Sequence, residues 1–561
     1  MFALNVVIIL GSICLAVYLY LSRNFKYWTS RGIDGPKPVI FFGTIYQQFF
    51  KSFPELTIHN TDTYGKIHGQ FMGTEPILVV AEPELVNKIL VTDFHKFSDR
   101  HNFLTGDPIN DRSLFNVNGN DWKLLRSIIS PTFSSGKMRS MHTIIIECVK
   151  RLEEEFTKKT MNGHKNELEV KKLFGGLTMD VIASCAFGTK TDTYNETEKS
   201  EFIVCAEKVF RHNWRVFLFF LLMKTFPKVL EWTQFNEFIV CAEKVFRHNW
   251  RVFLFFLLMK TFPKVLEWTQ FKSTDPKVEN FFRSALTSMI ANRKSMANRS
   301  KHNDYLQLMV NALNKTADNN SHITGNSAEE PDDTERIYGQ RDEKPMNSIK
   351  LKGELTEDDI LANTVLFLVA GYETTASLLS YLSYSLALNY KCQQKLYEEV
   401  MSFDGKYDYE SIAKMPYLEA CVAETLRLYN PLVVLFRMAN EDYKLGDTGI
   451  TIPKGMMVNL DVQSIHRNAD YYPNPDRWDP ERFLPENRDQ LAPHSYMPFG
   501  IGPRNCVGMR FGLMEAKTAV VCLVQKFRFT RSVSTCVPLI PKKHEFILNC
   551  GEINIGVELR K

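Results

Sequence analysis

One cysteine near the C-terminal end of the chain has an unusual sequence setting. The stretch PFGIGPRNCVGMRFG (498–512) places Cys506 among glycines, a proline and two arginines, directly before an apolar, helix-prone run. This pattern predicts a tight loop that ends at a helix N-terminus. Backbone N–H groups and the positive end of the helix dipole would then lower the pKa of the thiol. A thiolate in that position can act as a nucleophile or as a metal ligand.

The residues around Cys506 favour one of these two roles. A nucleophile needs a positioned histidine base, and the sequence offers no close candidate. A dinucleotide-binding turn would need a third glycine after Gly500 and Gly502, but Asn505 stands at that position. A metal site with a single thiolate fits haem iron, because the porphyrin supplies the four other ligands.

A second chemical candidate is an acid followed by an alcohol, Glu373 and Thr374, within AGYETTA (370–376). TEDD (356–359) is typical of a helix N-cap with acids in the first turn, and it opens an apolar run that extends to about residue 388. We expect a helix buried across a soluble core, because an ionised residue such as Glu373 is costly in a bilayer. Glycine and paired threonines weaken this helix. They indicate either a tolerated irregularity or a helix that bulges open beside a ligand.

A third pattern is ETLR (424–427), in a predicted helix that begins at Pro416 and ends before Pro431. Glu424 and Arg427 are three residues apart, so they share one helix face and can pair. Taken alone, such a pair is usually a solvated surface bridge.

Together these motifs resemble the cytochrome P450 haem-thiolate monooxygenases. FGIGPRNCVG (499–508) fits the family pattern F-x-x-G-x-R-x-C-x-G, and the other signatures follow in family order: WKLLR (122–126), AGYETT (370–375), ETLR (424–427) and PERF (480–483). The resemblance implies a mainly α fold with small β-sheets (α+β) and haem b, iron protoporphyrin IX, as cofactor. The sequence is most similar in style to the microsomal clan that contains drug-metabolising enzymes and arthropod or nematode detoxification enzymes.

The resemblance also implies a role for each matching residue. Cys506 would be the thiolate ligand of the iron. The other cofactor-binding positions, most of them donors to the haem propionates, would be Trp122, Arg126, Arg437, Phe499 and Arg504. A buried triad on the haem side of the core would consist of Glu424, Arg427 and Arg482, in contrast to the surface bridge expected from the pair alone. Glu373 and Thr374 would deliver protons during dioxygen activation.

The function implied is insertion of one oxygen atom from O₂ into a lipophilic small molecule. No nicotinamide or flavin fingerprint is present, so electrons would come from NADPH–cytochrome P450 reductase, and the resemblance leaves open a role for cytochrome b5. A haem-thiolate isomerase or dehydratase, or a non-catalytic haem protein, are the alternatives. The net charge is +4 and no Lys/Arg block occurs, so we expect no nucleic-acid partner. The scattered cysteines, without a C-x-x-C pair, argue against disulfides and structural zinc.

The N-terminal segment ALNVVIILGSICLAVYLYL (3–21) carries no charge and, as a helix, is long enough to cross a bilayer once. Basic residues follow it and none precedes it, which keeps the C-terminal side cytoplasmic. A cleaved signal peptide would want a basic start and a shorter apolar run. We expect a membrane anchor at 1–22, a Pro-rich linker at 23–38 and a cytosolic haem-thiolate monooxygenase domain at 39–561, held at the endoplasmic reticulum membrane.

Two further segments stand out within the body. Residues 201–235 recur letter for letter as 237–271. Two perfect copies in an otherwise unrepetitive chain indicate a recent tandem duplication or a duplicated exon in a gene model, since solenoid repeats drift and need more copies. The polar, Pro-punctuated stretch at about 311–353 lacks apolar periodicity and is predicted to be a mobile surface loop.

Overall fold

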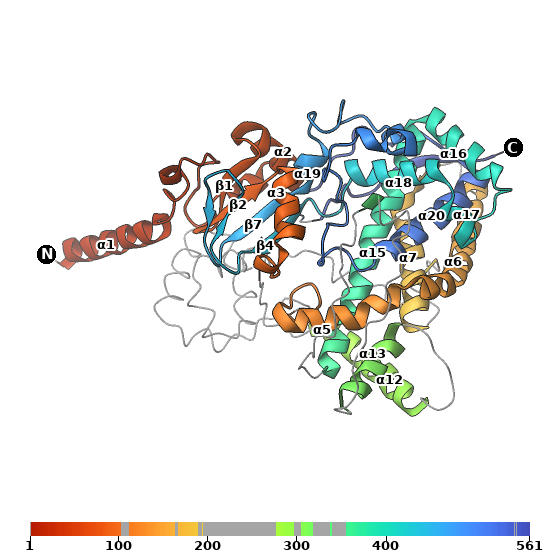
Figure 1. Cartoon of the computed structure of the whole chain (residues 1–561), viewed down its shortest axis with the longest axis horizontal. Helices are drawn as coiled ribbons and strands as arrows, with labels where there is room; N and C mark the ends of the chain where they lie inside the picture. The colour runs from red at the N-terminus through yellow and green to blue at the C-terminus, as the bar shows by residue number, and fades with distance from the viewer. Residues whose placement is uncertain are drawn as a thin grey trace.

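The computed structural model gives a helical body with a small sheet at the end nearest the N-terminal helix (Figure 1). It describes residues 2–101, 111–162, 167–188, 193–194, 276–296, 305–317, 337–338, 355–543, 545 and 547–560. The α-helices are α1 (Phe2–Ser22), α2 (Phe53–Tyr64), α3 (Pro83–Asn87), α5 (Gly119–Ile129), α6 (Ser135–Asn162), α7 (Val170–Phe187), α12 (Pro276–Met296), α13 (Tyr305–Ala317), α15 (Glu357–Leu388), α16 (Tyr390–Ser402), α17 (Tyr409–Ala413), α18 (Pro416–Leu428), α19 (Val462–His466) and α20 (Met509–Lys526).

Short 3₁₀ and π turns join these elements: η1 (Thr29–Arg31), η2 (Ile45–Phe49), η3 (Lys88–Thr92), η4 (Phe94–Lys96), η5 (Ser130–Phe133), η8 (Pro480–Phe483) and η9 (Pro485–Gln490). Helices dominate, and the strands form small separate sheets. The predicted α+β class with small sheets is therefore confirmed.

The largest sheet has the order β1-β2-β7-β4, built from β1 (Ile67–Met72), β2 (Glu75–Val80), β7 (Met457–Asp461) and β4 (Val434–Met438). β2 and β7 pair in parallel, with Ile77 opposite Met457, and the other pairs are antiparallel. A second sheet, of order β3-β9-β8, joins β3 (Glu167–Glu169), β9 (Asn554–Leu559) and β8 (Phe527–Thr530). A two-stranded ribbon pairs β5 (Tyr443–Lys444) with β6 (Thr451–Ile452). The first sheet positions Arg437, and the second leads directly into α7.

The long helix α15 runs through the middle of the body and packs against α7, α18 and α20 (Figure 1). Its N-cap is Thr356, whose side chain accepts a hydrogen bond from the Asp359 N–H while the Asp359 carboxylate accepts one from the Thr356 N–H. This capping box satisfies two of the otherwise unpaired donors at the helix start. The predicted cap and the predicted buried helix are both confirmed.

Two further helices also begin and end near their predicted positions. α18 starts at Pro416, where a residue without an N–H costs no intrahelical bond, and ends at Leu428. α20 starts at Met509 behind Gly508, directly after the Cys506 loop. The loop-to-helix arrangement predicted around Cys506 is therefore present.

Among the described residues, one helix is apolar and long enough by composition to cross a membrane, and it is the internal helix α15. More than half of the most apolar 18-residue stretch of α15 is buried inside the protein, as expected for a core helix. The N-terminal helix α1 is drawn projecting away from the body (Figure 1).

The duplicated segment 201–235 and 237–271 lies outside the described residues. The start of the segment at about 311–353, which was predicted to be a mobile surface loop, is helical, because α13 continues to Ala317; residues 318–336 and 339–354 lie outside the described part of the chain. Farther along this segment, Ile337 and Tyr338 are helical and the Tyr338 side chain is fully buried. The ring of Tyr338 lies edge-on to that of Phe499, with the centroids 5.5 Å apart.

Candidate active site

The loop that carries Cys506 is closed by its own backbone. The Cys506 N–H donates to the Phe499 carbonyl at 2.9 Å, and the Asn505 N–H donates to the Gly502 carbonyl at 3.0 Å. Gly502 has a φ of +75°, and a Cβ added there would lie 2.0 Å from the Leu90 carbonyl oxygen. Only glycine fits this position, because the loop backbone turns left-handed while it packs directly against η3.

The Cys506 thiol is accessible to solvent, yet the surrounding protein desolvates it. Burial raises its pKa, and the Gly508 N–H together with Arg126 and Arg100 oppose that change. The expectation that the helix N-terminus lowers the pKa below its ordinary value is therefore wrong in the net direction. The N–H group and cations act as expected, but the loss of water around a thiolate outweighs them.

Positive charge gathers beside Cys506. Arg126, Arg437 and Arg504 are all buried, with exposed fractions of 6, 2 and 4%. Burial and mutual repulsion lower the pKa of Arg504 to about 9 and that of the half-buried Arg100 to about 10. The pKa of Arg437 also lies well below its ordinary value, because of burial and then repulsion by Arg100 and Arg504. We call Arg100, Arg126, Arg437 and Arg504 the arginine cluster.

The arginine cluster has unused donors. Nε of Arg437, and Nε and Nη1 of Arg504, have no hydrogen-bond partner among the residues that the structure describes. Asp99 attracts Arg504, but burial and repulsion prevail over it. Buried cations are costly unless an anion pairs with them, so this cluster fits a ligand with negatively charged groups. The two propionates of haem b have that chemistry, and the thiol beside them suits its iron.

Individual members of the cluster are fixed by different contacts. The Arg504 guanidinium lies over the Trp122 ring, 4.6 Å from its centroid, and its Nη2 donates to the Val117 carbonyl. Arg126 donates to the backbone and side-chain oxygens of Asn505 at 2.9 and 2.7 Å. The structure thus brings Trp122, Arg126 and Arg504 together at the Cys506 loop. The hydrogen bonds from Arg126 to Asn505 stabilise that loop.

Arg100 is a member of the cluster that the sequence analysis did not single out. It follows Asp99, whose carbonyl accepts a hydrogen bond from Met438 on β4 at 2.8 Å. Its guanidinium points to the Phe115 carbonyl and to the Arg504 carbonyl, at 3.3 and 3.4 Å. No local motif marks Arg100, because it reaches the site only through packing of distant segments.

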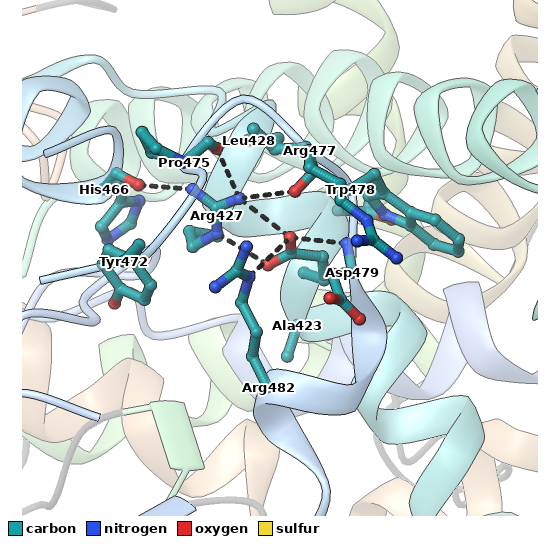
Figure 2. A network of polar contacts seen from close by, with 12 residues as sticks. Ala423, Arg427, Leu428, His466, Tyr472, Pro475, Arg477, Trp478, Asp479 and Arg482 are labelled. Carbon is teal, nitrogen blue, oxygen red and sulfur yellow. Dashed lines mark hydrogen bonds and ion pairs between the residues drawn. The ribbon is translucent and has the colours of Figure 1, made fainter. Parts of the chain in front are cut away.

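A second group of charges is centred on Glu424, which forms ion pairs with Arg427 and Arg482 (Figure 2). Arg427 makes a bidentate bond to the Glu424 carboxylate, with N–O distances of 2.7 and 2.8 Å. The Asp479 N–H donates to the same carboxylate at 2.8 Å, and Nε of Arg482 lies 3.5 Å from it. The side chains of Glu424 and Arg427 are completely buried, so this pair is not the surface bridge expected from its spacing alone.

The remaining donors of Arg427 are also satisfied, by backbone carbonyls. Nη1 donates to the His466 carbonyl at 2.6 Å, and Nη2 donates to the Pro475 carbonyl at 2.7 Å (Figure 2). The guanidinium carbon of Arg427 lies over the Tyr472 ring, 4.9 Å from the ring centroid. We call this set the Glu424 network. It ties α18 to the segment that precedes the Cys506 loop.

The acid and the alcohol of α15 have different partners. Thr374 Oγ1 donates to the Ala370 carbonyl at 2.7 Å, one turn earlier in the same helix. Glu373 lies 2.7 Å from Lys171 Nζ, on α7. The helix is continuous through 370–376, so of the two alternatives, a tolerated irregularity and a bulge, the bulge is not observed. A threonine hydroxyl can satisfy itself on the preceding turn without breaking the helix.

Known proteins similar to this chain agree with the haem-thiolate class that the loop and its arginines indicate. The family model described as Cytochrome P450 matches residues 33–330 and 269–557. Cytochrome P450 6k1 of Blattella germanica is 31% identical, over 95% of this chain and 93% of the relative. Cytochrome P450 3A56 of Fundulus heteroclitus is 32% identical, over 93% of each chain. Cytochrome P450 6B2 of Helicoverpa armigera is 28% identical, over 99% of this chain and 98% of the relative.

The chain therefore belongs to the cytochrome P450 family. Members of this family bind haem b and act as monooxygenase oxidoreductases.

Proposed function

We propose that this enzyme inserts one oxygen atom from O₂ into a lipophilic small molecule, with electrons from NADPH that arrive through NADPH–cytochrome P450 reductase. The observation that carries the proposal is the accessible Cys506 thiol close to Arg437 and Arg504, whose guanidinium groups keep donors with no hydrogen-bond partner among the described residues. Haem b, when bound, supplies the iron centre at which dioxygen is activated.

The protein's own residues would hold and orient the cofactor. Cys506 would bind the iron as a thiolate, and the arginine cluster would hold the propionates, with Arg437 and Arg504 supplying guanidinium donors that have no partner among the described residues. The negative charge of the propionates would raise the pKa values of the buried arginines toward their ordinary values. Haem binding would therefore favour the charged arginines, and the charged arginines would favour haem binding. Phe499 closes the loop through its carbonyl, which accepts the Cys506 N–H.

The proton-delivery roles fall to α15. Thr374 orients a water molecule with its hydroxyl, and Glu373 passes protons inward from solvent. Positioned acid–base groups of this kind typically contribute about 10²- to 10⁴-fold to a rate. The Lys171 contact is one reason to assign Glu373 this role, because it holds a carboxylate beside Thr374 in the middle of the core.

The N-terminal helix α1 would anchor the protein in the endoplasmic reticulum membrane, with the body in the cytosol. Its 21 residues carry no charge, and large apolar side chains on it are more than half exposed: Leu4, Ile8, Ile9, Leu15 and Leu19. Such a surface is stable in lipid and unfavourable in water. The specific partners, the reductase and cytochrome b5, belong to the same proposal.

The carbon monoxide spectrum of the dithionite-reduced protein tests the central assignment. Thiolate ligation shifts the Soret band strongly to the red, so we expect that band in the wild type and its loss in Cys506→Ala. Cys536→Ala is the matched control, because Cys536 is also an exposed free thiol but lies outside the loop. A red-shifted band that survives in Cys506→Ala would assign the iron ligand elsewhere.

A further inference from the structure

An ion pair connects the proposed proton-delivery acid to a neighbouring helix. Lys171 Nζ on α7 lies 2.7 Å from Glu373 Oε1 on α15, and the two side chains are only 14 and 15% exposed. Lys171 Nζ also donates to Asn549 Oδ1 at 2.8 Å. Glu373 accepts one further bond, from Ser377 Oγ at 3.4 Å. The carboxylate is thus held mainly by a single lysine.

The lysine itself is held in place by the second sheet. It stands in the first turn of α7, whose N-cap is Glu169, at the end of β3. The Val170 N–H donates to the Ile553 carbonyl at 2.9 Å, which fixes the backbone next to Lys171. Asn549 is fixed in turn, because its Oδ1 accepts the Gly551 N–H at 2.8 Å. The lysine therefore reaches Glu373 from a rigid base and not from a mobile loop.

The acid and the alcohol of α15 are held by different partners. Thr374 is bonded to the Ala370 carbonyl, whereas Glu373 is turned toward α7. An exposed ion pair would contribute little to stability. A largely desolvated pair with good geometry contributes more and also fixes the orientation of both side chains. Protonation would neutralise the Glu373 carboxylate and so weaken its contact with Lys171.

We propose that Lys171 is a positioning residue for proton delivery, an inference that rests on the role of Glu373 in the proposed function. In each cycle the Glu373 carboxylate takes a proton from solvent and, now neutral, parts from Lys171. It gives that proton to the water beside Thr374 and returns as a carboxylate to the lysine. Glu373 and Lys171 end unchanged, and one proton has moved from solvent to the water chain.

The test replaces Lys171 with methionine, which keeps the length and removes the charge, and with arginine, which keeps the charge. We expect Lys171→Met to lower product formed per NADPH about 5- to 10-fold, part of the range for a positioned acid–base group, and to raise peroxide release. KM and the carbon monoxide spectrum stay unchanged, and Lys171→Arg restores most of the coupling. Lys172→Met, at the exposed neighbouring position on α7, is the matched control.

Two measurements separate positioning from a structural role. Turnover driven by hydrogen peroxide, which brings oxygen already reduced and protonated, should be equal in Lys171→Met and wild type. In a double-mutant cycle with Glu373→Gln, Lys171→Met should cause no further uncoupling, and denaturant unfolding should show an interaction energy between the two positions. A loss of peroxide-driven turnover, or additive uncoupling, would overturn the proposal.

The remaining outcomes distinguish this inference from the proposed function. If Glu373→Gln uncouples the enzyme and Lys171→Met does not, Lys171 has no positioning role and the role of Glu373 stands. If neither variant uncouples, the role of Glu373 fails, and the Lys171 inference fails with it. The assignment of Cys506 is tested independently by the carbon monoxide spectrum.

Discussion

The Glu424 network and the arginine cluster both contain buried arginines, but they differ in whether these positive charges have negatively charged partners. In the network, Arg427 has a carboxylate and backbone carbonyls around it, and each charge is matched. In the cluster, Arg437 and Arg504 repel one another and keep donors without a partner in the part of the chain that the structure describes. Removing one partner of a matched buried pair leaves the other charge buried alone and destabilises the fold. An unmatched buried charge already makes the haem-free fold less stable and favours an anionic ligand.

The difference leads to opposite expected signs for substitutions of buried arginine. Removing a cation from the Glu424 network should harm the protein whether or not haem is bound. Removing one from the arginine cluster should help the haem-free protein and harm the haem-bound one. Three predictions test this contrast.

The largest effect is expected for Arg427→Leu. It leaves the Glu424 carboxylate buried without its main partner, and loss of one member of a buried pair typically costs about 3–5 kcal/mol. Urea unfolding should show this loss in the free energy of unfolding. Lys395→Leu, which removes the cation of an exposed pair with Glu481, is the control and should change stability by less than about 1 kcal/mol. Equal effects of the two variants would contradict the distinction between matched buried and exposed pairs.

A smaller effect is expected for Arg437→Gln, which should stabilise the haem-free protein and weaken haem binding. Loss of this desolvated charge should raise the free energy of unfolding of the haem-free protein by about 2 kcal/mol. Haem retention should weaken about tenfold, because one charge-assisted donor to the propionates is lost. Unfolding of both forms and haem transfer to apomyoglobin measure the two effects. Arg139→Gln, at an exposed arginine paired with Glu410, is the control. If the haem-free variant is instead destabilised, the charge of Arg437 behaves like the paired charges of the Glu424 network and the contrast fails for this residue.

The smallest effect is a pH dependence. Folding lowers the pKa of Arg504 to about 9 from its ordinary 12.5, so above about pH 9 the unfolded chain binds more protons than the folded chain. The free energy of unfolding contributed by Arg504 therefore rises with pH in that window. Haem-free wild type should be less stable than Arg504→Gln, by a margin that shrinks by about 1 kcal/mol between about pH 8 and about pH 10.

The comparison with Arg504→Gln isolates this arginine, because buried tyrosines titrate at alkaline pH in both proteins. With haem bound, the propionates should keep Arg504 charged, and the margin should then change little with pH. A margin that widens with pH in the haem-free protein would mean that folding does not lower the pKa of this arginine.

Local patterns explain why part of the fold and site could be predicted from sequence. The cap at Thr356, the start of α18 at Pro416 and the turn at Gly502 depend on residues a few positions away. Arg100 and Lys171 were missed for the opposite reason, because each reaches the site through contacts between distant segments.

The pKa direction at Cys506 illustrates the same limit. The helix behind the loop is visible in the sequence, but the desolvation that outweighs it comes from the whole surrounding core. The buried state of Glu424 and Arg427 is likewise a property of the fold and not of the four-residue motif. For the Glu424–Arg427 pair, the resemblance to a family carried information that local spacing could not.

The arginine cluster also has a consequence for how the chain survives in a cell. A ligand that binds only the folded state adds RT ln(1 + [L]/Kd) to its stability, about 4 kcal/mol at a thousandfold excess over Kd. Because burial and mutual repulsion lower the pKa of arginines in the cluster, we expect the haem-free fold to be less stable and the folded fraction to follow the supply of haem. Chains made faster than haem is supplied would remain open to proteases, so we expect the abundance of this enzyme to depend on haem supply as well as on synthesis.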